Sequence, residues 1–254
     1  MRKYIERADS HLSGRLSQFI WGYLLIVFIS AVVNSIFGGG SHGFHFRSQA
    51  STILGTTAQT ILTLGYVFEM FRFIREDQFE AVNIFKHIAE KIGDLLFLVL
   101  GIILVNWAFS SIIFAIIFGF FRLGGFGVWA LLSIISSVVS FIINLILSYL
   151  LIIYAYKYEN DPTQSFGTRF GASLREAWEH FGDFFRIDVH YLWPAYVSLF
   201  GSILLALMLV RNNVGLASTL LLAGTLFLIY WTTRFYPAAL LAKSYYYIDE
   251  RYEY

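Results

Sequence analysis

The chain has 254 residues, of which 57% are apolar and 14% are charged, and its formal net charge is +1. Soluble domains average about 45–50% apolar and about 25% charged residues, so this composition excludes an ordinary soluble globular protein. The absence of cysteine excludes disulfides, thiol nucleophiles and zinc–thiolate sites, and the balanced charge gives no indication of nucleic-acid binding. The composition therefore predicts an integral membrane protein.

Six apolar stretches are long enough to cross a membrane as helices. A bilayer core of about 30 Å requires roughly 20 residues at a rise of 1.5 Å each. The predicted spans cover residues 16–37, 51–73, 93–121, 128–157, 187–210 and 214–242. The first span is expected to be a retained helix rather than a signal peptide. The predicted fold is all-α: a single polytopic membrane domain over residues 1–254 with six transmembrane helices and two or three amphipathic interfacial helices.

The basic residues are unequally divided between the two sets of connections. Of the 18 Lys and Arg residues, 14 lie in or beside 1–15, 74–92, 158–186 and 243–254, whereas three lie on the opposite side. Positively charged connections stay in the cytoplasm. We therefore expect a multi-pass protein of the cell (inner or plasma) membrane with both termini cytoplasmic.

Two of the charged connections carry apolar residues at helical spacing. The apolar positions are Phe79, Val82, Phe85, Ile88 and Ile92 in one, and Phe166, Phe170, Leu174, Trp178, Phe181 and Phe185 in the other. Such a period is typical of amphipathic helices. We expect interfacial helices over about 76–92 and 165–185, with the apolar face toward lipid. Packing of this face on the helical bundle is the alternative, and both can apply to one helix.

These two segments also align with each other. Lys86, Glu90, Gly93 and Asp94 match Arg175, Glu179, Gly182 and Asp183 at a constant offset of 89 residues. The N-terminal segment, with Gly14 before its span, is a fainter third copy. The pattern predicts three units, each an interfacial helix followed by two spans. Parallel repeats occur among transporters, although gene duplication alone also produces them.

Four segments carry a resemblance to a known family. The first segment begins at Gly65-Tyr66, includes Arg75-Glu76-Asp77 and ends at Phe85-Lys86. The second is the YENDP sequence that ends at Pro162, and the third is SLREAWEHFGDFF at 173–185. The fourth begins at Tyr236-Pro237 and ends at Tyr245-Tyr246. On these segments the chain resembles domain-of-unknown-function family 975 of bacterial integral membrane proteins, related in architecture to the glycerophosphodiester phosphodiesterase membrane domain. The resemblance implies a multi-span fold in a bacterial cell membrane and no particular activity. Residues 148–156 lack the Pro-Gly that the family usually carries near the end of a span.

Uncharged polar residues inside the spans are the candidate ligand-binding positions. Asn106 and Asn144 are expected at the same depth near the membrane centre, where each amide can satisfy the other. Small polar residues recur on one face of the second and fourth spans. The candidates are Thr56, Gln59, Thr63, Asn106, Ser137, Ser140 and Asn144. Tight helix packing and a polar groove that faces inward, away from lipid, are alternative interpretations of these faces.

Four charged residues lie within or beside spans: Glu69, Arg72, Asp188 and Arg234. Arg234 is expected near the inner boundary, where it either extends its guanidinium to the headgroups or pairs with Asp188 or Glu69. Because an intramembrane charge is expensive, a role in binding a coupling ion or an anionic headgroup is the functional alternative.

The sequence predicts no catalytic residue, metal site or cofactor. His42 and His45 lie in a glycine-rich connection without a carboxylate to complete a metal site. We therefore expect a non-enzymatic protein that binds or moves a lipid or peptide amphiphile through an inward polar groove. The alternative is a structural, accessory or immunity-type protein that docks to a partner complex. Membrane lipids are the expected partners, with a membrane protein or a second copy of the chain as further alternatives and no nucleic acid.

Overall fold

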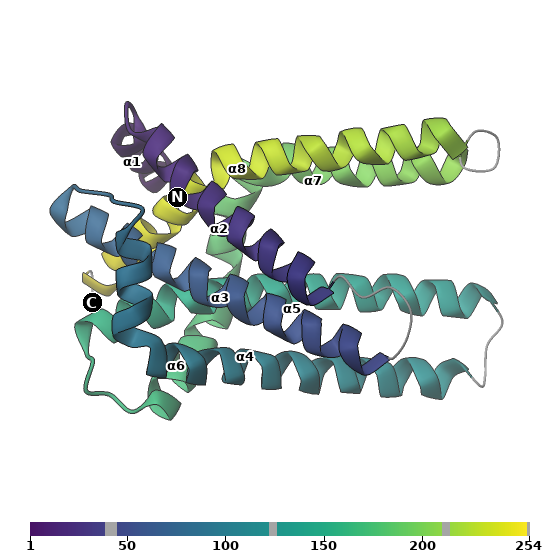
Figure 1. The fold of residues 1–254 in the computed structure, drawn as a ribbon, viewed down its shortest axis with the longest axis horizontal. Helices are drawn as coiled ribbons and strands as arrows, with labels where there is room; N and C mark the ends of the chain where they lie inside the picture. Colours follow the sequence, from purple (N-terminus) through teal and green to yellow (C-terminus); the bar gives the residue numbers. More distant parts are fainter. Residues whose placement is uncertain (39–44, 122–125, 210–213, 253–254) are drawn as a thin grey trace. The chain divides into compact units, whose positions relative to one another are not determined.

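The computed structural model describes residues 1–38, 45–121, 126–209 and 214–252, and within these ranges it contains helices and no β-strand. The helices are α1 (Arg2–Leu12), α2 (Leu16–Gly38), α3 (His45–Glu76), α4 (Asn83–Phe121), α5 (Phe126–Asn160), α6 (Phe166–Glu179), α7 (Phe181–Leu209) and α8 (Val214–Tyr252) (Figure 1). The prediction of an all-α fold is confirmed.

Within the described residues, four helices are long and apolar enough to cross a membrane. The segments are Leu16–Val33 of α2, Asn83–Phe109 of α4, Val138–Asn160 of α5 and Val214–Glu250 of α8. The protein is therefore suited to a membrane, as its composition predicts. The predicted spans 51–73 and 187–210 fall within α3 and α7 and are not among these four.

The chain forms two compact units. The first unit comprises Met1–Phe28, Glu69–Ala81 and Gly182–Tyr254, and the second comprises Ile29–Phe68 and Val82–Phe181. The first unit therefore holds α1, the start of α2, the end of α3, and α7 and α8. The second unit holds the remainder of α2 and α3 together with α4, α5 and α6.

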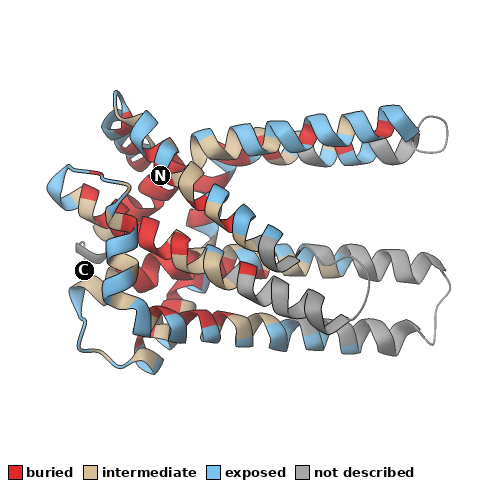
Figure 2. Ribbon diagram, viewed as in Figure 1, coloured by how far each residue is buried: buried red, intermediate tan, exposed pale blue. Residues whose placement is uncertain are grey.

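In the first unit, α1 packs on α8 through residues spaced four apart. Tyr4, Ala8 and Leu12 are buried, and the Tyr4 ring meets the Tyr246 ring edge to face at 5.5 Å between centroids. Such aromatic pairs add to the stabilisation from burial. Most of the last part of α8, from Pro237 to Tyr247, is buried, whereas most of its beginning is exposed (Figure 2).

Outside this core, α7 and α8 run side by side (Figure 1). Their separation is small at Gly224, where a Cβ atom would lie 2.6 Å from the Ser202 Cβ atom. Only glycine fits there, because the absent side chain lets the two helices approach closely. Many apolar side chains on the two helices are exposed, as expected for a surface that faces lipid; they include Trp193, Phe200, Leu204, Leu222, Leu226 and Ile229.

In the second unit, α4, α5 and α6 pack on one another. The inner part of α5, from Tyr149 to Ala155, is buried throughout. Glycines again mark close approaches: a Cβ atom at Gly65 would lie 2.8 Å from the carbonyl oxygen of Ile84, and one at Gly101 would lie 3.0 Å from the Phe170 ring.

The segment 76–92 does not form the separate interfacial helix that we expected. Residues 77–82 are not helical, Asp77 has a positive φ of 56°, and α4 then runs without a break from Asn83. No proline separates 83–92 from the apolar run that follows, and Gly93 is helical, so the polar and apolar stretches join into one helix. In the second connection α6 ends at Glu179, and residues 181–185 are the first residues of α7.

Candidate functional site

Helix α6 buries polar side chains, while the apolar side chains of Phe166, Phe170 and Leu174 are only half-buried. Arg169, Ser173 and Glu176 are buried, whereas Trp178 of the apolar stripe is 67% exposed. The carboxylate of Glu176 accepts a hydrogen bond from Lys157 Nζ of α5 at 2.8 Å. A buried charge requires such a partner, and this ion pair fastens the polar face of α6 to α5.

Arg169 holds the connection between α5 and α6. Its Nη2 atom donates to the carbonyl oxygens of Asp161 at 3.2 Å, Pro162 at 3.1 Å and Gln164 at 2.7 Å. Its guanidinium also lies over the Tyr158 ring, 4.6 Å from the centroid. Carbonyl groups in this connection have no helical partner, so the arginine replaces the missing hydrogen bonds. The YENDP sequence thus has a structural role as the partner of Arg169.

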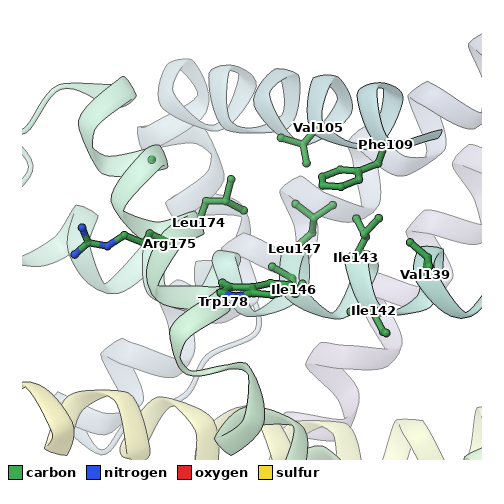
Figure 3. Close-up of a pocket in the computed structure, with 11 residues that line it drawn as sticks. Val105, Phe109, Val139, Ile142, Ile143, Ile146, Leu147, Leu174, Arg175 and Trp178 are labelled. Atoms are coloured by element: carbon green, nitrogen blue, oxygen red, sulfur yellow. The ribbon is translucent and has the colours of Figure 1, made fainter. Parts of the chain in front are cut away.

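The outward side of α6 borders an apolar pocket of about 670 Å³ that also opens between α4 and α5. Its lining consists of Val105 and Phe109 from α4, Val139, Ile142, Ile143, Ile146 and Leu147 from α5, and Gly171, Leu174, Arg175 and Trp178 from α6. Figure 3 shows the aliphatic side chains of α4 and α5 directed toward one another, with Trp178 beside them.

Arg175 is the one charged residue in the described lining of this pocket. Its guanidinium points away from the apolar side chains, and its Nε atom lies 3.2 Å from Glu179 Oε1 (Figure 3). The arrangement is therefore an apolar cavity with an arginine–glutamate pair at one end. No nucleophile or general base lines it among the described residues.

The predicted polar residues of α4 and α5 flank this pocket without lining it. Asn106 follows Val105, Ser140 follows Val139, and Asn144 follows Ile143. Asn144 is exposed, and its Nδ2 atom donates to the carbonyl oxygen of Ser140 at 2.9 Å in its own helix.

The expected amide pair between Asn106 and Asn144 is consequently wrong: among the described side chains no hydrogen bond joins them. A helix carbonyl four residues back is always within reach of an asparagine side chain, and a partner on another helix requires a matching register. Asn106 is half-buried.

The remaining uncharged candidates also form no common polar site among the described residues. Gln59 of α3 is exposed, and Thr63 of α3 is half-buried, as is Ser140. The exposure of Gln59 and Asn144 differs from our expectation that these faces turn inward. The side chains of Thr56 and Ser137 lie outside the described residues.

Asp188 and Lys243 form a buried ion pair in the first unit. Lys243 Nζ lies 2.7 Å from Asp188 Oδ1, and both side chains are at most 5% exposed. The Lys243 ammonium is also 5.9 Å from the centroid of the Tyr236 ring. The alternative in which Arg234 pairs with Asp188 is therefore wrong, and its extension to the headgroups stays a prediction. Arg234 is exposed, and its Nη1 atom donates to the Tyr230 hydroxyl at 3.1 Å.

Glu69 is fully buried, but its partners are local. Its Oε1 atom accepts from the backbone N–H of Glu80 at 2.8 Å and lies 3.4 Å from Arg72 Nη1. The carboxylate thereby anchors the backbone of the non-helical stretch that follows α3. Glu69 and Asp188 are both buried and both paired within the protein, which favours a structural role for them.

Two parts of the site were not predicted from the sequence. Lys243 belongs to the basic residues that indicate topology, and nothing in its local sequence marks it as the partner of Asp188. The lining of the apolar pocket is also unmarked, because its residues are ordinary apolar positions on three helices. The sequence holds two signals close to this pocket. One is Trp178, and the other is the i, i+4 pair of Arg175 and Glu179 at the edge of the apolar stripe.

The described residues contain no group of three or more His, Asp or Glu side chains that could hold a metal ion. No family model, curated protein or solved structure matches the chain. The fold and the pocket define the class as an all-helical protein with long apolar helices suited to a membrane and a cavity lined by apolar side chains.

Proposed function

We propose that this is a non-enzymatic integral membrane protein that binds or moves an amphiphile, and that the amphiphile is a membrane lipid. Its acyl chain occupies the pocket between α4, α5 and α6. Its headgroup lies at Arg175 and Glu179. The observation that carries the proposal is the apolar pocket itself, with an ion pair at one end.

The size and chemistry of the pocket favour an acyl chain. Its volume of about 670 Å³ lies within the range of about 300–1,000 Å³ that is typical of small-molecule sites. A peptide would bring backbone N–H and C=O groups into it, and each group left without a hydrogen bond would be costly. The described lining supplies aliphatic side chains and almost no polar partners, so a hydrocarbon chain is the better fit.

The exposed edge of α6 supports the same proposal. Trp178 at 67% exposure and the guanidinium of Arg175 lie at the level where an amphipathic helix meets headgroups. We propose that α6 is the interfacial helix, held to α5 by its buried polar side chains and open to lipid at Trp178.

We also propose the six-span topology with cytoplasmic termini, which adds α3 and α7 to the four apolar helices. The chain has no cysteine, so single cysteines introduced at Gln78 and Val214 report topology directly. Both positions are exposed. The six-span arrangement predicts that an impermeant thiol reagent labels them from opposite sides of the membrane. Labelling from the same side would contradict it. The resemblance to family 975 agrees with this topology, and membership in that family is part of the proposal.

The lipid site is tested by filling the pocket. Val139 lines it, whereas the neighbouring Val138 is 52% exposed and does not, so Val138→Trp is the matched control for Val139→Trp. Native mass spectrometry of the protein released from detergent counts the retained lipids. Val139→Trp is expected to lose a lipid that the parent and Val138→Trp retain. Equal retention by all three, or loss by both variants alike, would contradict the proposal.

A further inference from the structure

Three buried polar atoms on α5 and α6 have no hydrogen-bond partner among the described residues. They are the hydroxyl oxygen of Tyr154 on α5, and Arg169 Nε and Ser173 Oγ on α6. Each of these residues is at most 1% exposed. The large majority of buried side-chain polar atoms in proteins bond to another protein group or to an ordered water molecule. Three unpartnered atoms on two helices that pack together therefore require an explanation.

The three atoms belong to one cluster. Arg169 and Ser173 are four residues apart on α6, so their side chains are neighbours on one face of the helix. Arg169 Cζ lies 5.5 Å from the centroid of the Tyr154 ring, and the Tyr154 hydroxyl is close enough to interact with the guanidinium. Even so, no two of the three atoms meet the geometry of a direct hydrogen bond. A bridging water molecule gives polar groups at such separations nearly the enthalpy of a direct bond.

The chemistry of the cluster favours a neutral ligand that both accepts and donates hydrogen bonds. Arg169 Nε can only donate, whereas the hydroxyls of Tyr154 and Ser173 can donate or accept. A water molecule can accept from Arg169 and Tyr154 and donate to Ser173, which satisfies all three groups.

The charges around the cluster disfavour an ion of either sign. The guanidinium of Arg169 repels a cation. It already receives three carbonyl oxygens of the connection between α5 and α6, which stabilise its charge. Asp94 of α4 disfavours an anion, because its charge also acts on the Tyr154 hydroxyl. A neutral water molecule avoids both repulsions.

We propose that Tyr154, Arg169 and Ser173 bind one buried water molecule that joins α5 to α6. Buried waters make about three hydrogen bonds to groups that otherwise have none, and this cluster supplies three such groups. The site is separate from the acyl-chain pocket, because none of the three residues belongs to the described lining of that pocket. The water adds a second polar link between the helices, beside the ion pair of Lys157 and Glu176.

The direction of a stability change tests the water site. Thermal unfolding of the purified full chain in detergent gives the midpoint. A buried hydroxyl without any partner destabilises the fold, so its removal would raise the midpoint. A hydroxyl bound to water contributes a hydrogen bond instead. We therefore expect Tyr154→Phe and Ser173→Ala each to lower the midpoint by about 2–4 °C.

A double variant tests whether the two hydroxyls share one ligand. Loss of either hydroxyl releases the water, so Tyr154→Phe combined with Ser173→Ala should unfold at the midpoint of the less stable single variant. Ser148→Ala is the matched control for Ser173→Ala, because the Ser148 hydroxyl donates to the Leu145 carbonyl oxygen of its own helix at 2.7 Å. Its effect should add to that of Tyr154→Phe.

Each outcome decides the proposal. Lower midpoints in both single variants, without addition in the double variant, support it. An unchanged or higher midpoint in either single variant, or full addition in the double variant, would overturn it. A parent midpoint that rises when chloride replaces gluconate, while that of Tyr154→Phe does not, would assign the site to an anion and overturn the water. The same shifts should appear in a Val139→Trp background, so failure of the acyl-chain site and failure of this site are distinguishable.

Discussion

In the first unit the buried charges of Asp188 and Lys243 pair between two long helices, whereas buried charges in the second unit fasten one short helix and its loop. Lys243 of α8 meets Asp188 of α7 at 2.7 Å. In the second unit, Glu176 of α6 pairs with Lys157, and Arg169 of α6 donates hydrogen bonds to loop carbonyl oxygens. The difference shows two uses of expensive buried charge. One joins long helices, and the other turns a helix so that its apolar side remains available to a ligand.

Breaking the ion pair of the first unit is expected to have the largest effect on stability. Lys243→Met leaves Asp188 buried without its cation, and removing one partner of a buried pair costs about 3–5 kcal/mol of unfolding free energy. Unfolding of the purified protein in detergent, followed by circular dichroism, measures the loss. Arg234→Gln is the control, since Arg234 is exposed and bonds only a neighbouring tyrosine in its helix; its loss should be small.

A double variant tests whether the charge itself is responsible. Asp188→Asn combined with Lys243→Met removes both charges and should regain much of the stability that Lys243→Met loses. A double variant as unstable as the single one would show that the pair acts through packing rather than charge. The second unit offers the comparison: Lys157→Met should release α6, with a loss of bound lipid as well as of stability.

The close approach of α7 and α8 gives the next largest effect. Gly224→Ala places a Cβ atom 2.6 Å from the Ser202 Cβ atom, so the helices must separate. Overpacking of this kind costs about 1–3 kcal/mol. Gly201→Ala on α7 is the matched control, because nothing lies within 4 Å of its added Cβ. That control should be neutral or stabilising, as alanine favours a helix. Thermal unfolding of both variants measures the contrast, and equal midpoints would rule out the close contact.

Much of the fold was predictable because apolar runs of membrane length leave the backbone little alternative to a helix. The partners of individual side chains were not. Whether Asp188 meets Arg234 or Lys243 depends on the register of α7 against α8. Each helix contains a proline, Pro194 in α7 and Pro237 in α8, and the spacing of residues along the sequence does not predict how a proline changes the local helix geometry.

The candidate site was also predictable only in part, because its contacts depend on how the helices pack. The apolar stripe of α6 was predictable from its period, yet the period does not say which face meets the protein. That was decided by Lys157 and by the loop carbonyls that Arg169 binds, both outside the helix. The apolar pocket was not predictable, because its lining comes from three helices whose apolar residues look like ordinary packing positions in the sequence.

The smallest expected effect concerns the exposed pair of Arg15 and Asp77. Because the hydrogen bond from Arg15 lowers the pKa of Asp77 in the folded protein, the pair stabilises the fold above the unfolded value of about 4, and this contribution is lost as the pH falls through the lower folded value. Asp77→Asn should therefore lower the unfolding midpoint slightly at pH 5 and match the parent near pH 2. Comparing the two proteins at each pH cancels the titration of the other carboxylates. A difference that stays constant between pH 5 and pH 2 would show that Asp77 stabilises the turn after α3 through its backbone conformation, with a φ of 56°, rather than through its charge.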